Sequence, residues 1–286
     1  MVPYDPSQRY DVDTFDIEFL RHGADTYLAR VYRPRGEGPF PTVVDVHGGQ
    51  WHLQDRRSNA RVDLELAASG VLVVAIDFRL APGHPYPAAV QDVHYGVRWL
   101  KAKAHEYGGR PEPLGVFGGS SGGHLSELVA MRPHDPAFGA LELAEAPRLD
   151  ATVGYLILRA PISDPFARYE FAKRTGRDDI VRATEQFFVP WETIFAANPQ
   201  RLLARRDFQA QPPMLILQGG ADENIDPEIQ KTFAETYRAA GGDVELHVFP
   251  GMEHQFVQRD SAETTRALEL ARAFIARQVA SVPSGR

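Results

Sequence analysis

The chain has 286 residues, 43% hydrophobic and 24% charged, a balance typical of a globular protein with a sizeable core. Its net charge of −7 argues against the basic surface that nucleic-acid backbones attract, so no nucleic-acid partner is expected. The absence of cysteine excludes disulfides, thiolate zinc sites and a cysteine nucleophile. Without an export signal or an apolar stretch of roughly 18 residues, we expect no stable membrane association and a cytoplasmic location.

The pattern of apolar residues predicts a hairpin followed by alternating strands and helices. Apolar runs at 15–20 and 27–32 flank a turn at 22–25 and predict an antiparallel hairpin. Short β-branched or aliphatic runs then predict buried strands at 42–46, 71–76, 114–117, 151–157, 214–217 and 244–249. Apolar residues at three and four spacings predict helices at 57–68, 88–107, 227–240 and 262–279.

This alternation predicts an α/β fold, with one domain over residues 1–286 and a mostly parallel central sheet flanked by helices. Ligands of such sheets bind at the carboxyl ends of the strands. Residues 163–211 are too long for a simple crossover and are predicted to form a helical lid. Its aromatic residues either line a pocket or pack the lid onto the body. The residues predicted for the substrate pocket are Trp51, His124, Phe188 and Trp191.

A glycine-flanked serine follows the strand at 114–117. Gly119-Ser120-Ser121-Gly122-Gly123 fits the pattern G-x-S-x-G with Ser121 at its centre. In this pattern a sharp strand-to-helix turn holds a nucleophilic serine in a strained backbone conformation, with no room for neighbouring side chains. We therefore predict Ser121 as the nucleophile, with Ser120 as the alternative. The glycine spacing fits neither a Rossmann fingerprint nor a P-loop.

A second glycine-containing loop, His47-Gly48-Gly49-Gln50-Trp51, directly follows the strand at 42–46. By itself it is an ordinary glycine turn. Its position one strand-helix-strand unit before the serine places both loops at the same face of the sheet. We predict that the backbone amides of Gly49, Gln50 and Gly122 form an oxyanion hole.

An acid and a histidine follow the last two predicted strands. Asp222 lies just after 214–217, with Glu223 as the alternative acid, and His254 lies just after 244–249. The chain order Ser121, Asp222, His254 is the serine, acid, histidine order of α/β-hydrolases, so we predict these three as a catalytic triad. No H-E-x-x-H or comparable ligand spacing is present, and neither a metal nor another cofactor is predicted.

These motifs also carry a family resemblance over roughly residues 40–280. Together with the two loops, the run Asp77-Phe-Arg-Leu-Ala-Pro-Gly-His-Pro-Tyr-Pro-Ala-Ala-Val-Gln-Asp92 resembles the hormone-sensitive-lipase-like carboxylesterases. That family typically has HGGG, DYRLAPEHPFPAA and GDSAGG, from which this sequence departs at Gln50, Gly83, Ser120 and Gly122. The Gln50-Trp51 pair is more similar to the HGGxW motif of kynurenine formamidases and their feruloyl-esterase-like relatives.

The motifs and the resemblance lead to one predicted function and two alternatives. The prediction is a serine hydrolase of the α/β-hydrolase fold that cleaves small to medium carboxylic esters through an acyl-enzyme. An amidase acting on an aryl formamide is the first alternative, and a non-catalytic binding protein on the same scaffold is the second. The expected partner is a small-molecule ester or amide, and the sequence leaves both a monomer and a homodimer open.

Overall fold

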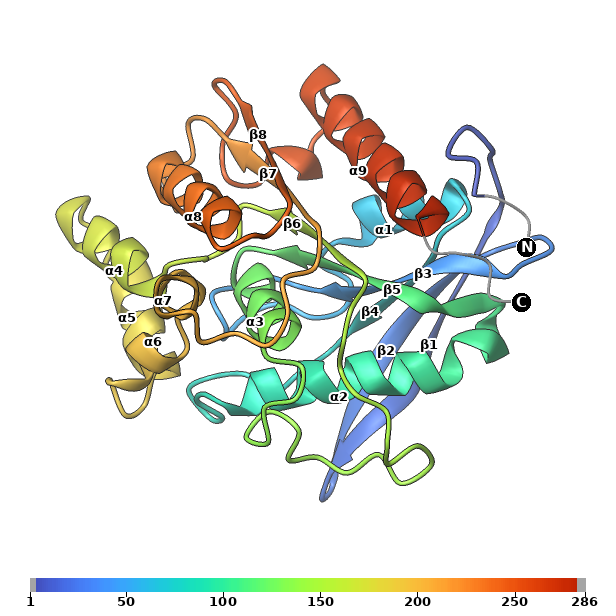
Figure 1. Cartoon of the computed structure of the whole chain (residues 1–286), viewed down its shortest axis with the longest axis horizontal. Helices are drawn as coiled ribbons and strands as arrows, with labels where there is room; N and C mark the ends of the chain where they lie inside the picture. Colours follow the sequence, from blue (N-terminus) through green and yellow to red (C-terminus); the bar gives the residue numbers. More distant parts are fainter. Residues whose placement is uncertain (1–3, 282–286) are drawn as a thin grey trace.

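The computed structural model describes residues 4–281. Within them an eight-stranded sheet has the strand order β1-β2-β4-β3-β5-β6-β7-β8 (Figure 1). Its strands are β1 (Val12–His22), β2 (Asp25–Pro34), β3 (Phe40–Val46), β4 (Leu72–Ile76), β5 (Gly109–Gly119), β6 (Tyr155–Arg159), β7 (Met214–Gly219) and β8 (Val244–Phe249). The main helices are α1 (Ala60–Ala68), α2 (Ala88–Lys103), α3 (Ser121–Met131), α8 (Pro227–Ala239) and α9 (Ala262–Ala280).

The sheet is antiparallel only at its N-terminal edge. β1 and β2 form the expected hairpin, and β2 pairs antiparallel with β4. Every later pairing, from β4–β3 to β7–β8, is parallel. The predicted α/β class with a mostly parallel sheet is therefore confirmed. The carboxyl ends of β3, β5, β7 and β8 consequently lie along one edge of the sheet.

One predicted strand begins later than expected. The apolar run at 151–157 indicated a strand, but β6 starts at Tyr155, which pairs with Gly115 of β5. The preceding Gly154 lies against Pro113, where an added Cβ would be 2.5 Å from the Pro113 Cβ. Because proline has no amide hydrogen to donate to a neighbouring strand, residues 151–154 lead into the sheet rather than extend it.

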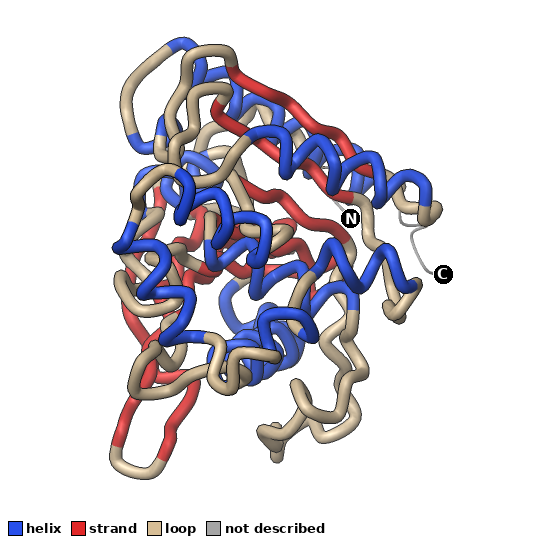
Figure 2. Tube along the Cα trace, turned by 90° about the vertical axis from the view of Figure 1, so that its left-hand side faces the viewer, coloured by secondary structure: helices blue, strands red, loops and turns tan. Residues whose placement is uncertain are grey.

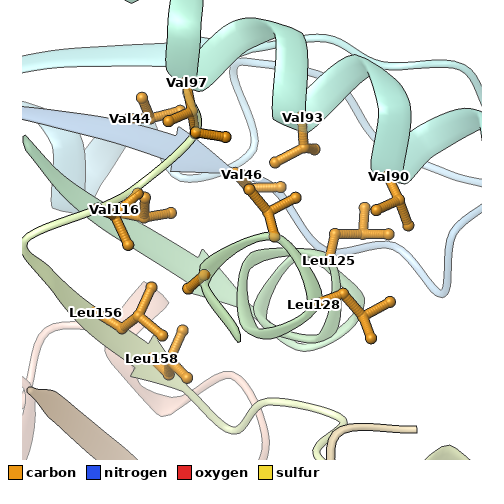
Figure 3. Packing of buried hydrophobic residues seen from close by; sticks show 14 of the residues in the cluster. Val44, Val46, Val90, Val93, Val97, Val116, Leu125, Leu128, Leu156 and Leu158 are labelled. Atoms are coloured by element: carbon orange, nitrogen blue, oxygen red, sulfur yellow. The ribbon is translucent and has the colours of Figure 1, made fainter. Parts of the chain in front are cut away.

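Helices cover both faces of the sheet, and every residue of β3, β4, β6 and β7 is buried. Side chains of α1 and α9 share one buried cluster with one face of the sheet, and those of α2, α3 and α8 share the other. Figure 3 shows part of the second cluster, in which Val44, Val46, Val116, Leu156 and Leu158 of the sheet lie near Val90, Val93 and Val97 of α2 and Leu125 and Leu128 of α3. Each such burial stabilises the fold by about 1.5–3 kcal/mol and gives the loops at the strand ends a rigid base.

The segment 163–211 between β6 and β7 folds into α4 (Pro165–Arg174), α5 (Asp178–Phe187), α6 (Thr193–Ala196) and α7 (Pro199–Arg205). These helices gather near α8 at the end of the molecule opposite the two termini (Figure 1), the end that faces the viewer in Figure 2. We call residues 163–211 the lid. None of the helices within residues 4–281 combines the length and the apolar character that crossing a membrane requires.

Candidate active site

The strained residue of the turn between β5 and α3 is Ser120. β5 ends at Gly119 and α3 begins at Ser121, and Ser120 between them has φ 52° and ψ −118°. A non-glycine residue in such a conformation costs about 1–3 kcal/mol and persists only where the surroundings impose it. Ser121 is instead the first helical residue, fully buried, with an Oγ that has no hydrogen-bond partner in the described part of the chain. The expectation that Ser121 occupies the strained turn is therefore corrected.

The glycine pattern explains this shift, because Gly118-Gly119-Ser120-Ser121-Gly122 also fits G-x-S-x-G, one residue earlier. A Cβ on Gly122 would lie 2.0 Å from the carbonyl oxygen of Val46, at the end of β3. A Cβ on Gly118 would lie 2.7 Å from Ser126 Oγ in α3. The glycines on either side of Ser120 thus allow β3, β5 and α3 to approach closely. The run of glycines around two serines fits the motif in two registers, and only the backbone distinguishes them.

Backbone hydrogen bonds hold Ser120 in place and connect it to His254. The Ser120 amide donates to the carbonyl oxygen of Arg159 at 2.9 Å, and the Ser120 carbonyl accepts from the amides of Ile162 and His124, each at 3.2 Å. The side chain of Arg159 is buried, and its Nη1 donates to the carbonyl oxygen of His254 at 3.1 Å. Arg159 therefore joins the serine turn to the loop after β8.

Asp222, in the loop after β7, is paired with His254. His254 Nδ1 lies 2.8 Å from Asp222 Oδ2, and the amides of Asn224 and Ile225 donate to Asp222 Oδ1 at 2.8 and 2.9 Å. Burial alone would raise the pKa of Asp222, but the hydrogen bonds from His254 and from these amides outweigh burial and lower it. Asp222 is consequently ionised at neutral pH. Glu223, the alternative acid, is exposed.

His254 is held as a neutral base. Burial lowers its pKa below the usual range, the contact with Asp222 opposes this effect, and the charges of Arg159 and Arg168 lower it further. Because an ionised carboxylate only accepts hydrogen bonds, Nδ1 must carry the proton, and Nε2 is left as the acceptor. Neither serine hydroxyl is hydrogen-bonded to another described residue, and contacts of this kind often tighten only when substrate binds.

The loop after β3 faces Ser120 with a strained backbone. Gly49, Gln50 and Trp51 all have positive φ angles, of 99°, 55° and 64°. Gly48 lies against the serine turn, since a Cβ added to it would be 3.3 Å from Ser120 Cβ. The amides of Gly49 and Gln50 make no backbone hydrogen bond within residues 4–281, so they are free to donate to a ligand.

The start of α3 supplies further free amides beside this loop. The first amides of a helix have no intrahelical acceptor, and in α3 His124 is the first to bond back, to the carbonyl of Ser120. With Ser120 in the strained turn, the amide immediately after it belongs to Ser121 rather than Gly122. The helix N-terminus also carries partial positive charge, which favours an anion at this point.

Three of the four residues predicted for the pocket are fully buried: Trp51, His124 and Phe188. Trp51 stacks on Phe187 at a ring separation of 4.7 Å, and its Nε1 donates to His124 Nδ1 at 3.2 Å. His124 Nε2 in turn lies 2.7 Å from the carbonyl oxygen of Ala197 in the lid. These rings therefore pack the lid onto the body, which is the second of the two roles that the sequence left open.

The fourth predicted residue, Trp191, is half-buried and lies 4.8 Å from the Tyr169 ring within the lid. A cavity of about 540 Å³ opens beside His254 instead, and none of the four predicted residues lines it. Its lining residues are Arg177, Ala221, Glu223, Asn224, Glu253, His254, Gln255 and Arg259.

Two buried arginines at this site were not predicted, because neither belongs to a recognisable sequence motif. Arg159 lies on β6, and Arg168 lies on α4, where it bonds to Asn224 in the acid loop. Their roles depend on contacts that are distant along the chain. Among residues 4–281 no group of three or more His, Asp or Glu side chains is arranged to hold a metal ion.

Comparisons with known proteins identify the family and the fold of the chain. Residues 43–258 match a family model described as the α/β hydrolase fold. Esterase LipC of Mycobacterium tuberculosis is 32% identical over 241 residues, which cover 79% of this chain and 55% of LipC. Carboxylesterase NlhH of the same organism is 32% identical over 223 residues, covering 76% of this chain and 67% of NlhH. The chain thus spans about half the length of LipC and two thirds of NlhH.

Among solved structures, the carboxylesterase EstE1, cloned from a metagenomic library, superposes with a TM-score of 0.76 at 25% sequence identity. The match covers 94% of this chain and 90% of EstE1. The family match spans well over half of the chain. The chain belongs to the α/β-hydrolase family.

Proposed function

We propose that this protein is a carboxylic ester hydrolase in which Ser120, rather than Ser121, is the nucleophile. The observation that carries the proposal is the strained conformation of Ser120 between β5 and α3. The Asp222–His254 pair and the link from Ser120 through Arg159 to the His254 loop support it. The relatives named as carboxylic ester hydrolases supply the reaction class.

In the first half of the proposed reaction, Ser120 Oγ attacks the ester carbonyl while His254 Nε2 accepts the hydroxyl proton. Asp222 stabilises the imidazolium that forms. Negative charge develops on the former carbonyl oxygen, and the amides of Gly49, Gln50 and Ser121 donate to it. In this scheme Ser121 takes the place predicted for Gly122, because the residue after the nucleophile supplies the second part of an oxyanion hole.

The second half returns the serine. The C–O bond to the alcohol breaks, His254 gives its proton to the departing alkoxide, and the acyl group stays on Ser120. Water then loses a proton to His254 and attacks the acyl carbon through the same oxyanion contacts. The ester of Ser120 breaks, the proton returns to Ser120 Oγ, and a carboxylic acid leaves.

The competing activity is hydrolysis of an aryl formamide, which the His47-Gly48-Gly49-Gln50-Trp51 motif suggested. Trp51 is packed against Phe187 and bonded to His124, so its ring stabilises the lid contact instead of presenting a free face to a small formyl group. We therefore place ester hydrolysis first and keep the formamide as the second candidate.

A steady-state comparison separates the two activities. The substrates are p-nitrophenyl acetate, butyrate and octanoate, with an N-formyl aromatic amide beside them, and the enzymes are wild type and Ser120→Ala. We expect the highest kcat/KM on one of the esters and a loss of about 10⁴-fold or more in Ser120→Ala. The highest kcat/KM on the formamide would favour the amidase, and equal rates for both enzymes would reject the proposed function.

A further inference from the structure

Arg168 is a buried cation that the proposed reaction does not use. It lies on α4 of the lid, and its side chain is 1% exposed. Its Nε and Nη2 both donate to Asn224 Oδ1, at 3.1 and 2.6 Å. The remaining nitrogen, Nη1, is buried and has no hydrogen-bond partner among the described residues. The guanidinium group is therefore bonded on one edge and lacks a hydrogen-bond acceptor on the other.

Among the described residues no carboxylate is bonded to Arg168; the charges of Asp222 and Asp179 act on it only at a distance and oppose the effect of burial on its pKa. Within residues 4–281 Arg168 forms no ion pair, and its only hydrogen-bond acceptor is a neutral amide. Leaving a buried charged group without a partner costs several kcal/mol, so native proteins rarely do so without a functional reason. Burial lowers the pKa of Arg168 to about 9, which still leaves it protonated at neutral pH.

The guanidinium group of Arg168 lies close to the proposed reaction centre. The Cζ atom lies 5.8 Å from the ring centroid of Trp51, in the loop whose amides face Ser120. Its anchor Asn224 lies two residues after Asp222 and lines the same cavity as His254. The positive charge also lowers the pKa of His254, which is expected only of a group that is near it. Arg168 thus lies where three segments meet: the lid, the loop after β3 that carries Trp51, and the loop after β7 that carries Asp222.

We propose that Nη1 of Arg168 binds a carboxylate carried by the substrate, so that the preferred substrates are esters with an anionic group near the scissile bond. The inference rests on the proposed ester hydrolysis and adds the substrate class to it. Guanidinium suits this role because its planar N–H groups match a carboxylate and remain charged when buried. A substrate carboxylate would supply the missing acceptor and compensate the buried charge.

Matched pairs of esters test the proposal in wild-type protein. Mono-(4-nitrophenyl) glutarate is compared with its methyl diester, which places the charge in the acyl part, and 4-acetoxybenzoate is compared with its methyl ester, which places it in the leaving group. We expect kcat/KM for the anionic member of at least one pair to exceed that of its neutral partner by about 10- to 100-fold, the factor expected of one charge-assisted hydrogen bond.

Two variants of α4 then assign the preference to one side chain. Arg168→Gln should abolish the preference for the anionic ester, so that both members of each pair are hydrolysed with similar kcat/KM. Arg174→Gln makes the same change at an exposed position of the same helix and should keep the full preference. In Arg168→Gln the acid limb of the pH profile should also move to higher pH, because a charge that lowers the pKa of His254 is gone.

The outcomes keep this inference separate from the proposed function. Equal kcat/KM for both members of both pairs, with Ser120-dependent hydrolysis of the neutral esters intact, would overturn the role of Arg168 and leave ester hydrolysis standing. A preference that survives in Arg168→Gln would also overturn it. Absence of hydrolysis of every ester would reject the proposed function itself. Equal kcat/KM within both pairs in wild type overturns the proposal even if Arg168→Gln fails to fold.

Discussion

The guanidinium group of Arg159 donates to the carbonyl oxygen of His254 at 3.1 Å, while the Arg159 carbonyl accepts from the Ser120 amide at 2.9 Å. One residue on β6 thus bonds to the backbone of both Ser120 and His254, the two residues proposed to react. Its guanidinium also fills the space beside Gly119, where a Cβ would lie 2.5 Å from Arg159 Nη2. Arg159 is therefore a positioning residue that acts through the two loops it joins.

Replacing Arg159 should affect the rate and the pH profile together. Arg159→Gln removes the bond to the His254 loop and a charge that lowers the pKa of His254. We expect kcat to fall by about 10- to 100-fold with a smaller change in KM, and the acid limb of kcat to move to higher pH. Arg57→Gln, which removes an exposed ion pair with Asp55, is the control. An unchanged pH profile in a folded Arg159→Gln protein would contradict this role.

The wild-type pH profile should extend further into acid than an ordinary histidine allows. The base must be neutral to accept the serine proton, and burial lowers the pKa of His254 below its usual value of 6.5. Activity is therefore retained as the pH falls through 6.5 and is lost only below it. The pH dependence of kcat/KM on a neutral ester measures this value. A midpoint at or above 6.5 would show that the contact with Asp222 outweighs burial.

Gly122 should tolerate no side chain, because an added Cβ would meet the carbonyl oxygens of Val46 and His47 at 2.0 and 2.3 Å. Backbone atoms cannot move aside as a flexible side chain can, so β3 and α3 would have to separate. We expect Gly122→Ala to reduce the free energy of unfolding by about 1–3 kcal/mol or more and to lower activity. Thermal and urea unfolding measure the change.

Gly83→Ala is the matched control for this substitution. The nearest atom to an added Cβ at that position is the carbonyl oxygen of Leu80, at 3.8 Å, so the change should be neutral within about 0.5 kcal/mol. Equal stability of Gly122→Ala and Gly83→Ala would show that the contact between β3 and α3 is looser than the structure has it.

Two buried acids on the face of the sheet covered by α1 and α9 should make the free energy of unfolding fall at high pH. Asp63 of α1 has both carboxylate oxygens buried without a hydrogen-bond partner in residues 4–281, and Asp45 of β3 accepts from Asn59 Nδ2 at 2.9 Å. Burial raises the pKa of Asp45 and of Asp63, and the charge of Asp45 raises that of Asp63 further. An acid with a raised pKa in the folded state stabilises at low pH and loses this contribution as the pH rises through that pKa.

Asp63→Asn tests the sign of this effect, because it keeps the shape of the side chain and removes its titration. We expect the variant to gain stability relative to wild type as the pH rises from 6 to 9, measured by urea unfolding at each pH. Asp16→Asn is the contrasting control: its pKa is lowered by hydrogen bonds from Arg30 and Arg56, so its loss should destabilise at neutral pH and matter less in acid. A constant difference for Asp63→Asn across this range would contradict the assignment.

The sequence predicted the sheet and the order of its loops because these depend on local patterns. The hairpin predicted from 15–20 and 27–32 and the strands that precede the acid and histidine loops all follow from runs of apolar residues and turn residues. The family match confirmed the α/β-hydrolase fold that the motifs implied. The predicted start of the strand at 151–157 was wrong, because it depends on the contact between Gly154 and Pro113 of the neighbouring strand.

The register of the serine turn could not be obtained in the same way. Ser120 and Ser121 are both flanked by glycines at two residues on either side, so the motif alone does not distinguish them. The close contacts of Gly118 and Gly122 with β3 and α3, and the φ of 52° at Ser120, exist only in the folded chain. The burial of Arg168 beside Trp51 also depends on tertiary packing, since α4 is far in sequence from the loop after β3 that carries Trp51.

Identifying the serine that reacts tests the account most directly. Wild type, Ser120→Ala and Ser121→Ala are treated with a fluorophosphonate, the adduct is located by peptide mass spectrometry, and hydrolysis of p-nitrophenyl butyrate is measured in parallel. Ser121→Ala removes a buried hydroxyl without a partner and keeps the backbone amide. We predict an adduct on Ser120, a loss of about 10⁴-fold or more in Ser120→Ala, and near wild-type activity in Ser121→Ala. An adduct on Ser121, with activity lost in Ser121→Ala and kept in Ser120→Ala, would contradict the account.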